Sequence, residues 1–378
     1  MSLNIVKIKG IQIKVHFTFL IVFILISWTI ATRLMPSLYP DLSSTEYWII
    51  GISGSLLLFV SVILHELAHS ITAIKYGIKV RQIILFIFGG VSDIQEEPRD
   101  FHKEFKIAIA GPLTSFILAG LFGSALLLVK SIGDILFLST QIVTAVLTYL
   151  TTVNVILGLF NLIPAFPLDG GRILRACLFR WKKNYEHATK IATKTGTIIS
   201  YFFIGIGFMN IVRGSFIEGL WILLIGLFLN NQSQSYLHNQ ELSNLLSKAN
   251  LENIMNSKVI TVKKNFKLEQ LLNDYFKVYF KSSFPVVDDD NVLMGIVTIK
   301  SVLDIPEEKR IHFTAADIMI PKNKLIMMDK NANVFDALKE MMNKNMNIVF
   351  ILSKEDTILG IISKSDIINI TTKLQYFQ

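Results

Sequence analysis

The chain has 378 residues, of which 52% are hydrophobic and only 17% are charged, and its mean hydropathy is +0.51. This composition excludes an ordinary soluble globular protein. The net charge of +8 would suit a nucleic-acid-binding protein, but the basic residues gather in particular loops between apolar runs, which indicates membrane topology instead. We therefore expect no nucleic-acid partner.

The apolar character is uneven along the chain. Residues 1–230 contain long apolar runs, whereas the residues after 250 alternate short apolar runs with Lys, Asp and Asn. This change predicts an α-helical polytopic membrane domain, followed by an α/β soluble module. The intervening residues 231–249 are polar and low in charge, and we expect them to be a linker.

A short basic lead precedes the first apolar run, and Gly10 within it favours a strand or hairpin. Six apolar runs follow, and each predicts a transmembrane helix in the bilayer. The last two are shorter than the ~20 residues that usually cross a membrane, so buried half-spans are the alternative for that pair. The predicted spans are residues 16–32, 48–69, 105–129, 142–163, 198–211 and 216–229.

The connections between these runs differ in charge, and this difference predicts the orientation of the chain. Basic residues are excluded from short external loops far more often than from internal ones. We therefore expect a multi-pass protein of the cell membrane with both termini and the soluble module in the cytoplasm. The basic segments are residues 1–15, 75–106 and 172–194, and the connections with one basic residue each are 33–47, 130–141 and 212–215.

The second apolar run ends in HELAH, which places His65, Glu66 and His69 within the membrane domain. Residues four apart share one face of a helix, so the two imidazoles can bind one metal ion. In metalloproteases with this spacing, the glutamate accepts a proton from the attacking water. The alternative is a pair of core histidines with a helix-capping glutamate. Ionisable groups inside a span are costly, however, and usually mark function.

A catalytic zinc needs a third protein ligand, and Asp169 in NLIPAFPLDGGR is the candidate. Pro164 and Pro167 should end the fourth helix, and Gly170–Gly171 permits a tight turn. The second span enters the membrane from outside near Trp48, and at ~1.5 Å per residue His65 lies roughly 25 Å further along a hydrocarbon core about 30 Å thick. His65 is therefore near the cytoplasmic side, where Asp169 is also expected. The alternative is that Asp169 caps the following helix and binds no metal.

These two motifs together resemble the site-2 protease family of intramembrane zinc metalloproteases, in the branch with six spans and C-terminal CBS domains. AGPL at 110–113 and FGGV at 88–91 extend the resemblance over nearly the whole chain. It implies that Glu66 is the general base and that Asn161 contacts the substrate backbone or oxyanion. Ala68 stands where the family usually has glycine, a small and helix-favouring change. The implied zinc ligands are His65, His69 and Asp169.

Residues 83–94 (IILFIFGGVSDI) are β-branched and aromatic and contain a double glycine, which predicts a strand or hairpin beside the active site. A protease that works in the membrane must unwind a helical substrate before cutting it. An exposed strand edge could hold the unwound segment. Simple loop packing is the alternative.

Residues 250–308 and 312–374 form an internal repeat, in which Gly295 pairs with Gly360. Each copy predicts a strand, an amphipathic helix, two strands joined by an acidic turn, and a final helix. The repeat resembles a tandem pair of CBS domains. A module that forms a homodimer and binds no ligand is the alternative to nucleotide binding.

The CBS resemblance implies that adenine nucleotide (ATP, ADP or AMP) binds through a hydroxyl residue and an aspartate three positions later. The second copy has Ser363 and Asp366, whereas the first has Thr298 with Ser301 in place of the aspartate. Because serine lacks the two acceptor oxygens of a carboxylate, we expect the cleft at Asp366 to be the stronger.

The sequence as a whole predicts a Zn²⁺-dependent intramembrane endopeptidase that cleaves a membrane-spanning protein substrate and responds to adenine nucleotide. A CBS-regulated cation transporter or channel is the alternative. Transport sites favour scattered carboxylates and unwound helices across repeats, however, and we find no inverted repeat in residues 1–230. A metal-free scaffold is a third alternative, opposed by the intact HELAH and Asp169 positions.

Overall fold

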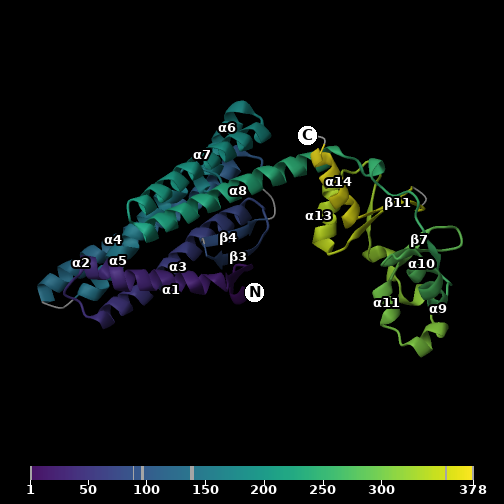
Figure 1. The fold of residues 1–378 in the computed structure, drawn as a ribbon, viewed down its shortest axis with the longest axis horizontal. Helices are drawn as coiled ribbons and strands as arrows, with labels where there is room; N and C mark the ends of the chain where they lie inside the picture. Colours follow the sequence, from purple (N-terminus) through teal and green to yellow (C-terminus); the bar gives the residue numbers. More distant parts are fainter. Residues whose placement is uncertain (1, 88, 95–97, 137–139, 354–355, 377–378) are drawn as a thin grey trace. The chain divides into compact units, whose positions relative to one another are not determined.

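The computed structural model describes residues 2–87, 89–94, 98–136, 140–353 and 356–376. The chain divides into two compact units, Met1–Leu237 and His238–Gln378. The first is a helical bundle with one small sheet, and the second contains two sheets and several shorter helices (Figure 1).

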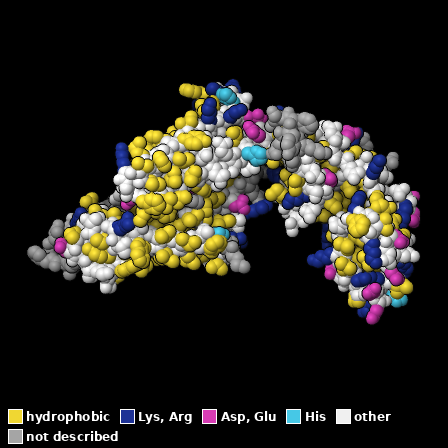
Figure 2. All heavy atoms as spheres, viewed as in Figure 1, with side chains coloured by type: hydrophobic (Ala, Val, Ile, Leu, Met, Phe, Trp, Pro, Cys, Tyr) yellow, Lys and Arg dark blue, Asp and Glu magenta, His cyan; other side chains and the backbone are white. Residues whose placement is uncertain are grey.

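Within the described residues, six helical stretches are long and apolar enough to cross a membrane, which confirms the predicted number of spans. Hydrophobic side chains cover much of the visible face of this unit, as expected for contact with lipid (Figure 2). The stretches are α1–α2 (Thr18–Thr29, π-helical Ile30–Leu34, Met35–Leu38), α3 (Ser44–Lys75), α4 (Phe101–Leu136), α5 (Gln141–Asn161), α7 (Tyr185–Val212) and α8 (Phe216–Lys248).

The last two spans are longer than their apolar runs, with 28 residues in α7 and 33 in α8. α7 begins inside the basic segment 172–194, and α8 continues to Lys248 through the polar residues expected to be a linker. The half-span alternative is therefore wrong. The polar end of α8 remains helical because it has an apolar side: Leu246 is buried, with Leu242 packed against the same cluster.

α3 carries the HELAH motif near its C-terminal end. The helix begins with a capping box, in which the Ser43 hydroxyl and the Glu46 carboxylate satisfy each other's backbone N–H groups. It ends at Lys75, and Gly77 follows with a φ of +79°. The HELAH motif therefore lies in the last turns of a 32-residue helix.

Both predicted hairpins are present, and they join into one sheet. β1 (Ser2–Ile8) pairs with β2 (Ile11–His16), and β3 (Val80–Phe86) pairs with β4 (Gly89–Ile94). Parallel pairing of β2 with β3 gives the order β1-β2-β3-β4, which leaves β4 at an edge. Figure 1 shows β3 and β4 beside α3. Phe88, at the start of the FGGV motif, lies outside the described residues.

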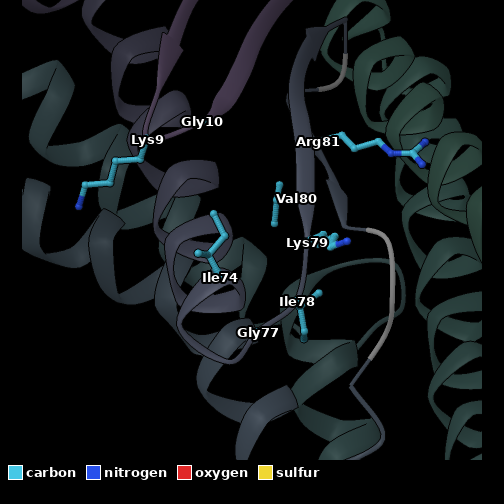
Figure 3. A pocket seen from close by; sticks show the side chains of 8 residues that line it. All are labelled: Lys9, Gly10, Ile74, Gly77, Ile78, Lys79, Val80 and Arg81. Carbon is cyan, nitrogen blue, oxygen red and sulfur yellow. The ribbon is translucent and has the colours of Figure 1, made fainter.

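A shallow pocket of about 440 Å³ lies where the β1–β2 turn, the end of α3 and the start of β3 meet (Figure 3). Its basic side chains, Lys9, Lys79 and Arg81, belong to two of the segments that predict the cytoplasmic side. Lysines and arginines also gather at the α6 (Asp169–Lys182) end of the helices in Figure 2. No residue of the HELAH motif lines this pocket.

The second unit contains the two repeats, each with the predicted order of elements. The first sheet has the order β5-β6-β7-β8 and the second the order β11-β10-β9. The strands are β5 (Val262–Lys263), β6 (Ser283–Val287), β7 (Leu293–Thr298), β8 (Ile320–Pro321), β9 (Ile326–Met328), β10 (Ile348–Leu352) and β11 (Ile358–Ser363). The helices are α9 (Leu268–Leu271), π-helical Leu272–Phe276, α10 (Lys277–Tyr279), α11 (Ile299–Leu303), α12 (Ala315–Ile318), α13 (Val334–Lys344) and α14 (Lys364–Tyr376).

The two repeats exchange their leading segments. β8, from the start of the second copy, pairs with β7 of the first, and Asn256 bridges to Ile361 of the second. The paired glycines make room for this exchange. A Cβ at Gly295 would lie 2.8 Å from the Met319 sulfur, and one at Gly360 would lie 2.7 Å from the Met255 sulfur. The repeats therefore form one pseudo-symmetric module.

Candidate metal centre

Three buried side chains meet inside the helical bundle. His65 and His69 come from α3, and Asp169 is the first residue of α6. The Asp169 Oδ2 atom lies 3.2 Å from His65 Nε2 and 3.1 Å from His69 Nε2. Ligands around a tetrahedral zinc are about 3.3 Å apart, given Zn–N distances near 2.0–2.1 Å. The spacing of these atoms therefore suits a single metal ion.

The second nitrogen of each imidazole is held by α4. His65 Nδ1 lies 2.8 Å from the Ser115 hydroxyl oxygen, and His69 Nδ1 lies 2.7 Å from the Ile107 carbonyl oxygen. A carbonyl can only accept, so His69 donates from Nδ1 and presents a lone pair at Nε2. His65 Nδ1 can likewise donate to the serine oxygen, so both histidines can present Nε2 to a metal ion. The sequence did not predict either contact, although Ser115 lies two residues after the AGPL motif.

Gly111 leaves the space that an ion would need. A Cβ at this position would lie 2.1 Å from His69 Nε2 and 2.5 Å from His65 Nε2. The glycine of the AGPL motif therefore forms one wall of the centre, directly opposite the two ligand nitrogens. Two imidazoles, one carboxylate and a backbone wall with no side chain together fit a zinc ion.

Replacing Gly111 by alanine should empty this centre while leaving the helix intact. Alanine is about 1 kcal/mol better than glycine inside a helix, which offsets part of the roughly 1–3 kcal/mol that overpacking against the two histidines would cost. The added methyl group would occupy the volume beside both Nε2 atoms. Gly120→Ala is the matched control, because a Cβ there meets nothing within 4 Å on the same helix. Elemental analysis should find zinc in the control only, and full zinc in Gly111→Ala would contradict this account of the space.

The segment that presents Asp169 is shaped by the prolines and glycines on either side. α5 ends at Asn161, ahead of Pro164 and Pro167, as predicted. The expected tight turn at Gly170–Gly171 is wrong, because both glycines lie in the first turn of α6. They are needed for close packing instead: a Cβ at Gly170 would lie 2.3 Å from two backbone oxygens of the preceding loop.

Asp169 does not serve as the cap of this helix. The N-cap residue of α6 is Leu168, and the Asp169 carboxylate contacts the two histidines. Asp169 is one residue past the N-cap position, so its position does not support the alternative that it only caps the helix.

Glu66 lies against the β3–β4 hairpin. Its Oε2 accepts a hydrogen bond of 2.7 Å from the Ser92 hydroxyl of β4. A Cβ at Gly90 would lie 2.5 Å from the Glu66 Cγ, so the strand and the glutamate are in close contact. The predicted placement of a hairpin beside the HELAH motif is confirmed, whereas the contribution of Ser92 was not predicted.

The remaining predicted site residues make local contacts. Asn161 is half-buried and its side-chain nitrogen donates to the Leu157 carbonyl of its own helix, at 3.0 Å. In the second unit, Asp366 accepts from the Ser363 hydroxyl at 2.6 Å, and the Thr298 hydroxyl accepts from the Ser301 amide at 3.1 Å. These pairs cap the helices that follow β11 and β7.

The sequence matches the model of Peptidase family M50 over residues 53–138 and 129–203, and that of the CBS domain over 251–308 and 315–372. It is 32% identical over 377 residues to the zinc metalloprotease MJ0392 of Methanocaldococcus jannaschii, covering 99% of this chain and 97% of that protein. It is 28% identical over 361 residues to Rip3 of Mycobacterium tuberculosis, covering 96% of this chain and 90% of that protein.

Among solved structures, the chain is similar to the site-2 protease from Methanocaldococcus jannaschii, with 31% identity and a TM-score of 0.42. The match covers 63% of this chain and 95% of that one. The relatives favour a metallopeptidase over the transporter or channel alternative. The chain belongs to peptidase family M50, the site-2 protease family of multi-pass membrane zinc metalloproteases, and it carries a tandem pair of CBS domains.

Proposed function

We propose that this protein is a zinc-dependent endopeptidase that cleaves membrane-spanning segments of protein substrates within the bilayer. The observation that carries this proposal is the buried cluster of His65, His69 and Asp169, with Glu66 beside it, on a bundle of membrane-spanning helices. Purified protein should cleave some members of a panel of single-span substrates in detergent. Chelation should stop this cleavage, and added zinc should restore it. Cleavage that survives chelation would contradict the proposal.

In the proposed reaction, His65, His69 and Asp169 would hold the zinc ion. Zinc, when bound, polarises the scissile carbonyl and lowers the pKa of water towards ~7. Glu66 accepts a proton from the water whose oxygen bonds to the carbonyl carbon. It then returns the proton to the amide nitrogen as the C–N bond breaks. The Ser92 hydroxyl donates to Oε2 of Glu66 and so restrains its carboxylate.

The edge of β4 is the proposed contact for the unwound substrate. β4 ends the sheet order, and Ser92 within it contacts the proposed base. A peptide that pairs with this edge would be extended and would have its backbone near Glu66. Asn161 is proposed to contact the substrate backbone or the oxyanion from the end of α5.

The proposed orientation places the termini and the CBS module in the cytoplasm. The basic segments at the β1–β2 turn, after α3 and along α6 support this side. Cleavage near this face would release the cytoplasmic part of a membrane-tethered substrate.

The CBS module is proposed to bind adenine nucleotide and to regulate the protease. The second copy retains both Ser363 and Asp366, whereas the first copy has Thr298 followed by Ser301. A homodimerisation module without a ligand is the alternative, and binding measurements distinguish the two.

Calorimetry on the full chain in detergent should detect AMP, ADP or ATP with micromolar affinity. Asp366→Ala removes a charged acceptor and should weaken binding roughly tenfold or more. Ser301→Ala is the matched control and should change the affinity little. The absence of heat with all three nucleotides, in folded protein, would refute nucleotide binding.

A further inference from the structure

The polar part of α8 contacts the segment that leads into Asp169. The Ser233 hydroxyl donates a hydrogen bond of 2.5 Å to the carbonyl oxygen of Phe166, and both residues are buried. α7 also packs against the Phe166 carbonyl, because a Cβ at Gly196 of α7 would lie 2.2 Å from that carbonyl oxygen. The loop before Asp169 is therefore held by a specific bond from α8.

A second contact from α8 reaches α6 itself. Arg175, one of the residues of α6, is completely buried, and its Nε donates to Glu104 of α4 at 2.6 Å. Its Nη1 donates to the Tyr236 hydroxyl of α8. The guanidinium lies over the rings of Phe166 and Tyr236, 5.2 and 5.5 Å from their centroids. Leaving one partner of such a buried ion pair without the other is strongly destabilising, so the fold favours this arrangement of Arg175.

These contacts hold Asp169 from both sides along the chain. Ser233 bonds to the residue three positions before it, and Tyr236 bonds to the arginine on the helix that it begins. Zinc ligands must be placed within about 0.2 Å of their proper distances. A short helix that starts at a metal ligand cannot keep that tolerance by itself, so its neighbours determine where the carboxylate lies.

We infer that Ser233 and Tyr236 of α8 are positioning residues for Asp169, acting through Phe166 and Arg175. The inference rests on the proposed zinc centre. The Ser233 hydroxyl contacts Phe166 and the Tyr236 hydroxyl contacts Arg175, so each would act on Asp169 through another residue. α8 continues without a break to Lys248, and Leu246 near its end is buried in the core of the second CBS repeat.

The inference is tested with Tyr236→Phe and Ser233→Ala, each of which removes one hydroxyl and keeps the packing. The controls are Tyr201→Phe, an exposed tyrosine of α7, and Ser247→Ala, an exposed serine of α8. The two controls should unfold near the parent temperature, whereas each test variant removes one partner of a buried polar group, which costs about 1–3 kcal/mol. Metal release is therefore compared at a temperature where all four proteins are folded. Each is loaded with Co²⁺ to record the visible d–d spectrum, and with Zn²⁺ to follow its release to a chelator.

Both test variants should show an altered cobalt spectrum and faster zinc release than the parent, by up to about the 10–100-fold loss of metal affinity that follows when a group bonded directly to a ligand is removed. Their kcat should fall while KM changes by less than about twofold, because the substrate contacts are intact. The controls should match the parent in every readout. An unchanged spectrum and release rate in both test variants would overturn this inference alone. A parent that binds neither metal would overturn the proposed function and this inference together.

Discussion

Glu66→Gln is expected to abolish peptide cleavage while the protein keeps its zinc. The amide has the shape of the carboxylate but cannot accept a proton from water, so the loss in kcat should be about 10²–10⁴-fold. The Ser92 hydroxyl can still donate to the amide oxygen, so the side chain should stay in place. Single-turnover cleavage and elemental analysis on the same preparation measure the two effects.

The matched control for this variant is Glu218→Gln. Glu218 is exposed on α8 and lies 3.6 Å from Arg33, a surface pair that contributes at most about 1 kcal/mol. The control should retain zinc and activity. Activity in Glu66→Gln within about tenfold of the parent would exclude Glu66 as the base, whatever its zinc content.

Asp169→Ala is expected to remove the zinc itself. Loss of outer contacts to a metal ligand already weakens binding 10–100-fold, so loss of a charged ligand should weaken it by at least ~10²-fold. The two histidines would remain, held by Ser115 and the Ile107 carbonyl, but a two-ligand site does not retain zinc against a chelator. Zinc content after dialysis measures the effect.

Asp41→Ala, in the exposed connection before α3, is the control for Asp169→Ala. It changes the same charge far from the cluster along the chain and should keep full zinc. If Asp169→Ala also retained one zinc per chain after dialysis, the third ligand would have to be another residue.

The parts of the centre that follow from local spacing could be predicted from the sequence. His65 and His69 share a helix face because they are four residues apart, and Asp169 follows prolines that must end α5. The repeat in the second unit was equally visible, because Gly295 and Gly360 recur with the same neighbours.

The contacts between distant segments could not be predicted in this way. Ser92 meets Glu66, and Ser115 meets His65, only because a sheet edge and a neighbouring helix pack against α3. From the sequence, Arg175 is one of several basic residues in the segment 172–194, and it is expected to lie in a loop. In the structure it is completely buried against Glu104. Composition alone cannot distinguish a solvated arginine from a paired one, because the difference lies in the partner that the fold supplies.

The continuation of α8 shows a related limit. Residues 231–248 are polar and suggested a linker, yet they carry both the bond from Ser233 and the buried Leu246. A few apolar residues on one face of a helix are a weak signal of a buried helix when polar residues surround them. Tertiary packing, rather than helix propensity, decides such segments.

The most direct test of the central claim is mass spectrometry of the fragments released from a single-span substrate by the zinc-loaded protein in liposomes. The account predicts two complementary peptide fragments whose new ends lie inside the apolar segment, towards its cytoplasmic end. Neither fragment should appear with Glu66→Gln. Cleavage only in the substrate's soluble regions, or the same intramembrane ends with Glu66→Gln, would contradict the assignment of this centre as an intramembrane protease.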